Sequence, residues 1–272
     1  MDTGSPAWIP KDIYFGIGIT MKTKQERTGK KSLSGLSAKT EAKQQDVMAG
    51  LPSVQGVLDF LRLLSRNNDR DWFTENKALY LENKAKVENL IAWLVPKMQA
   101  FDKELRFVDP KKCLYRIYRD IRFSPDKRPY KDYMGIGISR QGRHGMCSGY
   151  YIHLQPGECI CGAGVYGLEP EKLKKVRDGI YFQSARLRQI LDAPAVRKLY
   201  GGAMAESARM KVPPKGYDKN FPDIDLLKYH YYFLERPIPD AEVESPDFAW
   251  HLLESLEAAS EFNRFLNEAL DF

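Results

Sequence analysis

The apolar residues that follow Pro52 first recur at helical spacing. One such stripe predicts a short helix that Ser53 can cap and that ends at the polar turn Asn67–Asp69; it contains Val54, Val57, Leu58, Leu61 and Leu64. The apolar spacing from Phe73 to Met98 predicts a longer helix that begins near Asp69 or Asp71. We expect Pro96 to kink or end this helix, because proline lacks the amide hydrogen that a helix uses.

Strand-like alternation replaces helical spacing in the middle of the chain. Between Leu114 and Phe123 the pattern predicts a strand with one apolar face, broken by Arg119, and one solvated face that carries Arg116, Tyr118, Asp120 and Arg122. Short runs bounded by Gly or Pro predict further strands over 133–138, 149–154 and 159–165. The aromatic run LLKYHYYFL, Leu226 to Leu234, predicts another. We expect the central strands to form an antiparallel meander.

Helical spacing returns toward the C-terminus. Pro170 marks the start of a helix that reaches Gln183, a second helical piece covers Ser184 to Tyr200, and an amphipathic helix covers Pro246 to Leu270. Strands grouped in the middle with helices toward both ends favour an α+β fold, with a central, mainly antiparallel sheet and helices from both ends of the chain packed against it. Residues 52–272 are long enough to form a single domain with a substantial core.

Residues 1–51 differ from the rest of the chain. From Met21 to Gly50 large apolar side chains are scarce, which predicts a disordered or poorly ordered extension. The apolar run Ile13 to Thr20 is too short to span a bilayer and lacks signal-peptide features, but it could add a strand. Met21 and Met48 could each serve as a start, so the sequence leaves open whether residues 1–47 belong to the native protein.

The four cysteines occur in a chain without a recognisable export signal, so we expect reduced thiols, a cytoplasmic location and no membrane partner. Cys159 and Cys161 would share one strand face, with His153 across a turn at Pro156–Gly157. A hairpin that pairs Gln155 with Glu158 places His153 opposite Ile160, away from both thiols, whereas a loop one residue longer places it opposite Cys161. Because no CxxC pair is present, buried thiols are favoured over zinc and we predict no metal site.

Positive charge is concentrated between Lys111 and Lys131, a segment that contains eight basic residues and only two acidic ones. The excess of positive charge in this segment equals the net charge of +6 of the whole chain. Tyrosine and phenylalanine rings are interleaved with these cations. The pattern predicts an anion site, and its candidate residues are Arg116, Arg119, Arg122, Lys127, Arg128 and Lys131. The alternative is a solvated charged face with an internal Arg119–Asp120 ion pair.

Two other segments have features of binding elements. The stiff, proline-containing loop from Lys211 to Asn220 presents Lys215 as a cation and Tyr217 as a ring that could stack on a planar ligand; the alternative is a structural connector. The run Asn67 to Phe73 is better explained as a helix cap and a core anchor.

Five ordered motifs in this sequence resemble one family. They are NNDRDWFTENKALY (67–80), YRIYRDIRFSPDKRPYK (115–131), GYYIHLQPGE (149–158), GAGVYGLEP (162–170) and VPPKGYDKNFP (212–222). The resemblance, which covers about residues 52–272, is to the bacterial and fungal family catalogued as domain of unknown function 2461. It implies an α+β fold and no established activity. Where that family has an acid-His-Pro triplet, this chain has Asn220-Phe221-Pro222, so no role of that histidine carries over.

Three classes of function fit these features. The first, which we favour, is a cytoplasmic domain that binds a phosphorylated or nucleotide-like ligand; if it is an enzyme, Asp120 or His153 is the candidate acid or base. The second is nucleic-acid binding, in line with the pI of about 8.9. The third is a protein-interaction domain without catalysis, with LLKYHYYFL as its surface if it is exposed. The sequence identifies no cofactor, substrate or oligomeric state.

Overall fold

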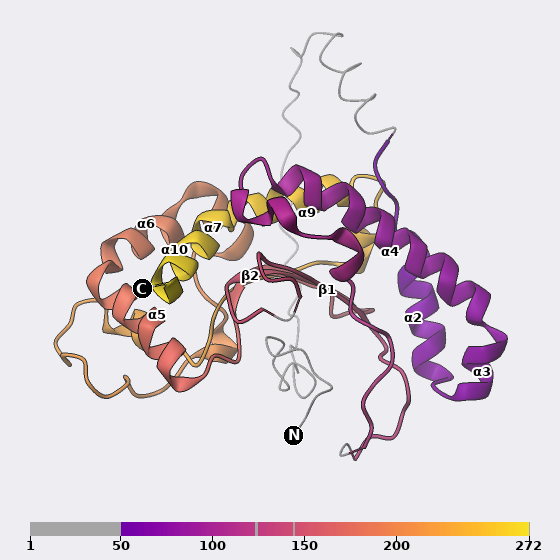
Figure 1. Cartoon of the computed structure of the whole chain (residues 1–272), viewed down its shortest axis with the longest axis horizontal. Coiled ribbons are helices and arrows are strands. Elements are labelled where there is room, and N and C mark those ends of the chain that lie inside the picture. The colour runs from indigo at the N-terminus through magenta and orange to yellow at the C-terminus, as the bar shows by residue number, and fades with distance from the viewer. Residues whose placement is uncertain (1–49, 123–124, 144, 272) are drawn as a thin grey trace, which may run out of the picture.

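The computed structural model describes residues 50–122, 125–143 and 145–271 and shows an α+β fold (Figure 1). The predicted disorder of residues 1–51 and the extra strand considered at Ile13–Thr20 concern residues 1–49, which lie outside the described part.

The described residues form a four-stranded antiparallel sheet of order β1-β2-β3-β4. Its strands are β1 (Met134–Ile138), β2 (Gly149–Leu154), β3 (Ile160–Val165) and β4 (Tyr232–Pro237). The predicted central meander is therefore confirmed. The fourth strand begins at Tyr232 rather than Leu226, because Leu226 and Leu227 turn in the 3-10 element η5 (Ile224–Leu227).

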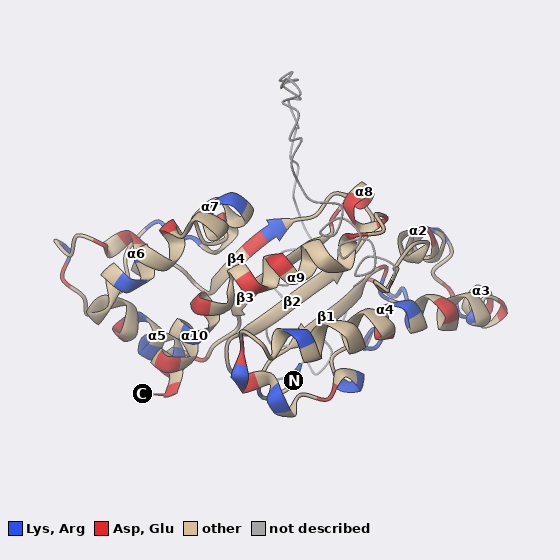
Figure 2. Ribbon diagram, turned by 90° about the horizontal axis from the view of Figure 1, so that it is seen from above, with Lys and Arg blue, Asp and Glu red and all other residues tan. Residues whose placement is uncertain are grey.

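Helices cover one face of this sheet. They include α4 (Lys77–Met98), α9 (Phe248–Ala258) and α10 (Ser260–Asp271) (Figures 1 and 2). One row of paired residues across the sheet is fully buried beneath them: Ile138, Tyr150, Ala163 and Leu234. The ribbon of the sheet is largely free of charged residues, which lie mainly on the helices and loops (Figure 2). Burial of these strand side chains against the helices contributes apolar stabilisation.

The first predicted helix begins later than expected. It is α2 (Val57–Arg66), and the residue before it is Gly56, with a left-handed φ of 82°. Ser53 does not cap this helix; its hydroxyl accepts a hydrogen bond from the Gln55 amide at 3.2 Å and forms a local turn instead.

The long helix predicted from Asp69 to Met98 is divided into α3 (Arg70–Glu75) and α4. Asp69 caps α3 as predicted, since its carboxylate accepts from the amides of Asp71 and Trp72 at 3.0 and 2.9 Å. The break falls at Asn76, whose side chain donates to the Trp72 carbonyl at 2.9 Å and competes with the backbone. Pro96 lies inside α4, which ends at Met98.

The strand predicted from Leu114 to Phe123 is wrong. Described residues of this segment make only the isolated bridges Leu114↔Ile136 and Tyr118↔Tyr130. The chain doubles back, and the Lys131 amide donates to the Ile117 carbonyl at 2.8 Å. Pro125 and Pro129 on the returning side have no amide hydrogen to give, which prevents a continuous ladder. The predicted alternation of burial nevertheless holds for Tyr115 to Tyr118.

Proline and local capping also divide the C-terminal helices. The helix predicted from Pro170 is confirmed as α5 (Pro170–Phe182). The next piece is interrupted in front of Pro194, giving α6 (Ser184–Asp192) and α7 (Pro194–Tyr200). The closing helix is interrupted at Ala259 between α9 and α10. Shorter elements are η2 (Lys103–Phe107), η3 (Pro110–Lys112), η4 (Glu206–Ala208) and α8 (Asp240–Val243).

The main apolar cluster takes side chains from Val54 to Leu266, and thus from both helical ends and the sheet. A second, smaller cluster lies on the other face of the sheet and contains Tyr115, Tyr151 and Phe233. Among the described helices, none combines the length and apolar character that crossing a bilayer requires.

We predict that Gly162→Ala strongly destabilises the fold. A methyl group there would lie 2.0 Å from the Leu234 carbonyl oxygen and 2.6 Å from the Phe233 ring, and a paired backbone cannot move aside. The free energy of unfolding should fall by about 3 kcal/mol in urea denaturation. Gly50→Ala, where a methyl meets nothing within 4 Å, is the control and should change little. Equal stability of the two variants would contradict this close packing.

Candidate functional site

The side of the sheet opposite α4, α9 and α10 carries the candidate site. Because side chains alternate along a strand, the register places on this side Gly135, Gly137, Tyr151, His153, Gly162, Phe233 and Glu235. We call it the open face only because it lacks the helical layer of the other face; all of these residues except Glu235 are buried. None of the described helices lies beneath the middle of the sheet on this side (Figure 1).

Gly135 is the floor of the site. A Cβ atom there would lie 3.0 Å from the Tyr151 hydroxyl oxygen and 3.3 Å from the Tyr115 ring. Two phenolic side chains therefore fold over this residue from β2 and from the segment before the sheet. Any larger residue at this position would displace the Tyr151 hydroxyl.

A chain of hydrogen bonds runs along the open face beside Gly135. The Gln155 amide nitrogen donates to Glu158 at 3.1 Å, so the Gln155 oxygen is the atom that faces His153 Nε2, 2.8 Å away. His153 Nε2 must then donate, which leaves Nδ1 as an acceptor for the Tyr151 hydroxyl at 3.0 Å. The chain thus assigns the tautomer of His153 and makes it a base toward Tyr151.

His153 is only 2% exposed, and its ring stacks on Tyr133 with 4.4 Å between centroids. Burial lowers the pKa of His153 to about 4, so the imidazole is neutral at physiological pH. Sequence analysis named His153 as a candidate acid or base but missed Tyr151. The sequence could have indicated Tyr151, because residues two apart on a strand, such as Tyr151 and His153, share a face.

The structure decides between the two registers considered for His153. The Glu158 amide donates to the Gln155 carbonyl at 2.9 Å, and His153 lies opposite Ile160. Cys161 is paired with Ile152 and faces the helices instead. Burial raises the pKa values of Cys159 and Cys161 to about 12 and 11. Within the described residues, no group of three or more His, Cys, Asp or Glu side chains is arranged to hold a metal ion.

Lys131 contributes a buried amine to the same face. It is 7% exposed, and its Nζ lies 5.8 Å from the Tyr115 ring centroid and 5.5 Å from that of Tyr133. Burial, followed by the nearby charges of three arginines, lowers the pKa of Lys131 to about 8. Its ammonium makes no hydrogen bond or ion pair with the described residues. We call Lys131, Tyr133, Tyr151, His153 and Gln155 the Lys131–His153 cluster.

Positive charge surrounds the amine. Arg116 is exposed and has no ion pair within the described part of the chain. Arg143, from the β1–β2 connection, donates to the carbonyls of Lys112 and Leu114 at 2.7 and 3.0 Å, and its guanidinium lies 5.7 Å from the Tyr115 ring. Arg143 was missed by sequence analysis, because it lies outside the basic run and only the folding of the chain brings it there.

The other predicted cations lie in a loop with acidic partners. Arg119 pairs with Asp126 at 2.6 Å, rather than with Asp120 as the alternative supposed. Arg128 pairs with Asp126 at 2.8 Å and with Asp132 at 3.1 Å. The Lys127 amine donates to a backbone carbonyl, that of Ile121, at 3.1 Å.

Arg122 pairs with Asp120, with Nε and a terminal nitrogen 3.0 and 2.6 Å from the carboxylate oxygens. These hydrogen bonds lower the pKa of Asp120 to about 2, so it stays ionised and is a poor proton donor at neutral pH. Asp120 therefore fixes the guanidinium of Arg122. The predicted strand face shared by Arg116 and Arg122 does not form, because the described residues of this segment make no strand.

Lys215 and Tyr217 belong to a different part of the surface. Their loop lies on the side of α5, at the opposite end of the molecule from the loop that carries Arg119 to Arg128 (Figure 1). The Tyr217 hydroxyl donates to Asp178 at 2.8 Å, and its ring lies 5.5 Å from that of Tyr181. These contacts hold Tyr217 against α5, as in a structural connector.

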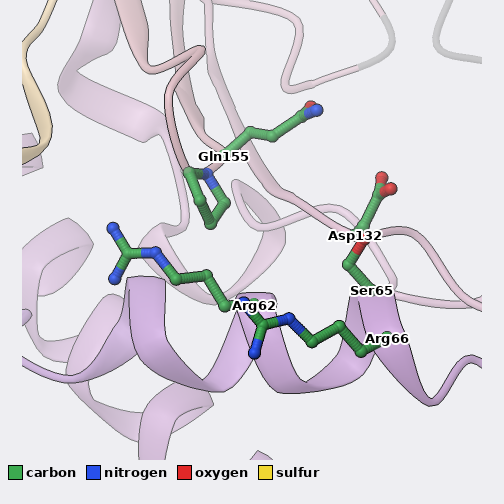
Figure 3. Close-up of a pocket in the computed structure, with 6 residues that line it drawn as sticks. Arg62, Ser65, Arg66, Asp132 and Gln155 are labelled. Atoms are coloured by element: carbon green, nitrogen blue, oxygen red, sulfur yellow. The ribbon is translucent and has the colours of Figure 1, made fainter.

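A shallow hollow of about 160 Å³ adjoins the cluster at Gln155 (Figure 3). It is lined by Arg62, Ser65 and Arg66 of α2 and by Asp132, Gln155 and Pro156. Its volume is below the roughly 300 Å³ of small ligand pockets. Arg62 is already paired with Asp59 and Asp240, both at 2.6 Å. The hollow therefore extends the cluster but is not a site by itself.

We predict that His153 makes the fold acid-sensitive. The native state disfavours its proton, so the unfolded state binds more protons between about pH 6.5 and 4 and stability falls as pH falls through this window. Between pH 7 and 4.5 the wild type should lose roughly 2–3 kcal/mol more than His153→Gln in denaturant titrations. His251→Gln, at a side chain that is 43% exposed, is the control. An equal pH dependence in all three proteins would show that His153 is not buried.

Comparison with known proteins identifies the family of this chain. No curated protein and no solved structure is similar enough to match the chain. The family model described as "Conserved hypothetical protein (DUF2461)" matches residues 56–265, which contain α2 to α9, the whole sheet and the Lys131–His153 cluster. The resemblance seen in the five motifs is thereby confirmed, and the chain belongs to the DUF2461 family.

Proposed function

We propose that the open face binds a small phosphorylated or nucleotide-like anion at Lys131 and Arg116. The observation that carries this proposal is the buried ammonium of Lys131, which has no carboxylate partner among the described residues. Burying an unpaired charge is unfavourable, and the adjacent guanidiniums add to that cost. An anion that reaches Lys131 would replace the missing counter-charge and gain charge-assisted hydrogen bonds.

The aromatic rings around the amine support a ligand with a planar part. Tyr115 and Tyr133 flank Lys131 Nζ, and Phe233 extends the ring surface along the open face toward β4. An anionic group at the amine would leave the remainder of a small ligand over these rings. Stacking on a ring face adds favourable contact without requiring a particular hydrogen-bond pattern.

The two alternative functions have less support in the arrangement of residues. For nucleic-acid binding, the loop cations Arg119, Arg122 and Arg128 already have carboxylate partners, so less of the basic run is left for a backbone of phosphates. For a protein interface, the run LLKYHYYFL has its large apolar side chains inside, with Tyr232 and Leu234 fully buried.

We predict that Lys131→Met combined with Arg116→Ala weakens the binding of inorganic phosphate or a nucleoside phosphate by at least about tenfold, because each lost charge-assisted hydrogen bond is worth roughly 1.5–3 kcal/mol. Isothermal titration calorimetry of the full chain would measure it. Lys215→Met removes one charge from the exposed loop beside α5 and is the matched control; it should bind as the wild type does.

Unchanged affinity in the double variant, with the fold intact, would overturn the proposal. A short oligonucleotide should be titrated in parallel at low and high salt. Binding of the oligonucleotide alone, lost at high salt, would favour the nucleic-acid function instead.

A further inference from the structure

We propose that Lys131 is a nucleophilic amine that forms a reversible imine with a carbonyl compound carrying a carboxylate or phosphate, while Tyr151 and His153 transfer the protons. This inference rests on the proposed anion site and names the substrate class of that site. It is suggested by one juxtaposition: a buried amine without a counter-charge among the described residues lies over the Tyr133 ring, on which the His153 imidazole stacks, and that imidazole is hydrogen-bonded to the Tyr151 phenol.

The surroundings of Lys131 suit a nucleophile. Only a neutral amine attacks a carbonyl carbon, and enzymes obtain one by burying a lysine or placing it beside other cations. Lys131 has both conditions, and its pKa of about 8 leaves about half of it neutral at pH 8. An ordinary lysine is less than about 1% neutral at that pH, so Lys131 has roughly a hundredfold more of the reactive form.

Groups from several elements set the charge of this amine. The ionisable side chains near it are Arg116 and Arg119 from the segment before the sheet, Arg143 from the β1–β2 connection, His153 from β2, and the phenols of Tyr115 and Tyr133. Asp132, the next residue, is paired with Arg128 at 3.1 Å. Cations therefore outnumber anions around Lys131, which favours the neutral amine and attracts an anionic substrate.

The proton path is provided by Tyr151 and His153. Lys131 Nζ lies 5.5 Å from the centroid of the Tyr133 ring, on which His153 stacks, and Lys131 is close enough to His153 to lower its pKa; the Tyr151 hydroxyl is hydrogen-bonded to that same imidazole. In this path, Tyr151 Oη takes a proton from the amine and passes its own phenolic proton to His153 Nδ1, 3.0 Å away. The reverse transfers return it to the substrate oxygen.

The reaction balances without an oxidant, a reductant or another cofactor. The amine nitrogen bonds to the carbonyl carbon, and the carbon–oxygen double bond becomes a single bond in a carbinolamine. The carbon–oxygen bond then breaks as the carbon–nitrogen double bond forms. Both amine protons leave on the oxygen as water, and each passes through Tyr151 and His153. Arg116, whose charge acts on Lys131, would hold the carboxylate or phosphate of the substrate.

The test is reductive trapping on the full chain. Incubation with glyoxylate and sodium cyanoborohydride converts an imine into a stable secondary amine, which intact-mass measurement and peptide mapping locate. We expect one dominant adduct on Lys131, formed at least about tenfold faster than on any other lysine and faster as pH rises from 7 to 9. Acetaldehyde, which lacks the carboxylate, should react more slowly.

Three variants separate the parts of the proposal. Lys131→Arg keeps a cation but has no reactive amine, so it should form no adduct at this position. Tyr151→Phe and His153→Gln should slow the trapping relative to Lys215→Met, which should be trapped at Lys131 as fast as the wild type. A labelling pattern spread evenly over surface lysines would overturn the imine proposal.

Phosphate binding by the wild type without an adduct on Lys131 would also overturn the imine while leaving the anion site intact. If the wild type did not bind phosphate at all, the function on which the inference rests would be overturned. Equal rates with glyoxylate and acetaldehyde would contradict the requirement for an anionic substrate.

Discussion

The turn from Gln155 to Glu158 fixes the arrangement on which the site depends. Its backbone hydrogen bond of 2.9 Å sets the register of β2 on β3 and so decides which residues face the helices. A shift by one residue would exchange the two faces of a strand. Either His153 would then enter the apolar core or Cys161 would leave it, depending on which of the two strands shifted. The same turn holds Gln155 and Glu158 side by side, and their contact selects the tautomer of His153.

The sequence pattern predicted burial better than it predicted hydrogen bonding. It located β1 to β3 from short runs bounded by Gly or Pro, and α5 from apolar residues at helical spacing after Pro170. It failed at 114–123, where Tyr115 and Ile117 are buried as expected but prolines on the returning chain prevent a ladder. The divisions at Asn76 and before Pro194 depend on side-chain competition and local sterics, which apolar spacing does not record.

The sequence predicted which charged residues belong to the candidate site, but not how they are paired or buried. The density of cations pointed to Lys131 and Arg116, but it could not show which arginines have acidic partners. That depends on how the loop doubles back, as with Arg119 and Asp126. The burial of Lys131 follows from the same folding, and so does its approach to Tyr133 and His153. Composition suggested an anion site, whereas the geometry separates a core amine from the surrounding loop cations.

The ion pairs of that loop give the site a further property. Asp126 joins Arg119 to Arg128, and Arg128 in turn joins Asp132, the residue next to Lys131. These ion pairs connect the loop to Asp132, the sequence neighbour of Lys131. Exposed ion pairs weaken as dissolved ions screen them. Rising ionic strength would therefore have two effects on this protein: it would weaken the attraction for the proposed anionic ligand, and it would weaken the ion pairs that connect the loop to Asp132.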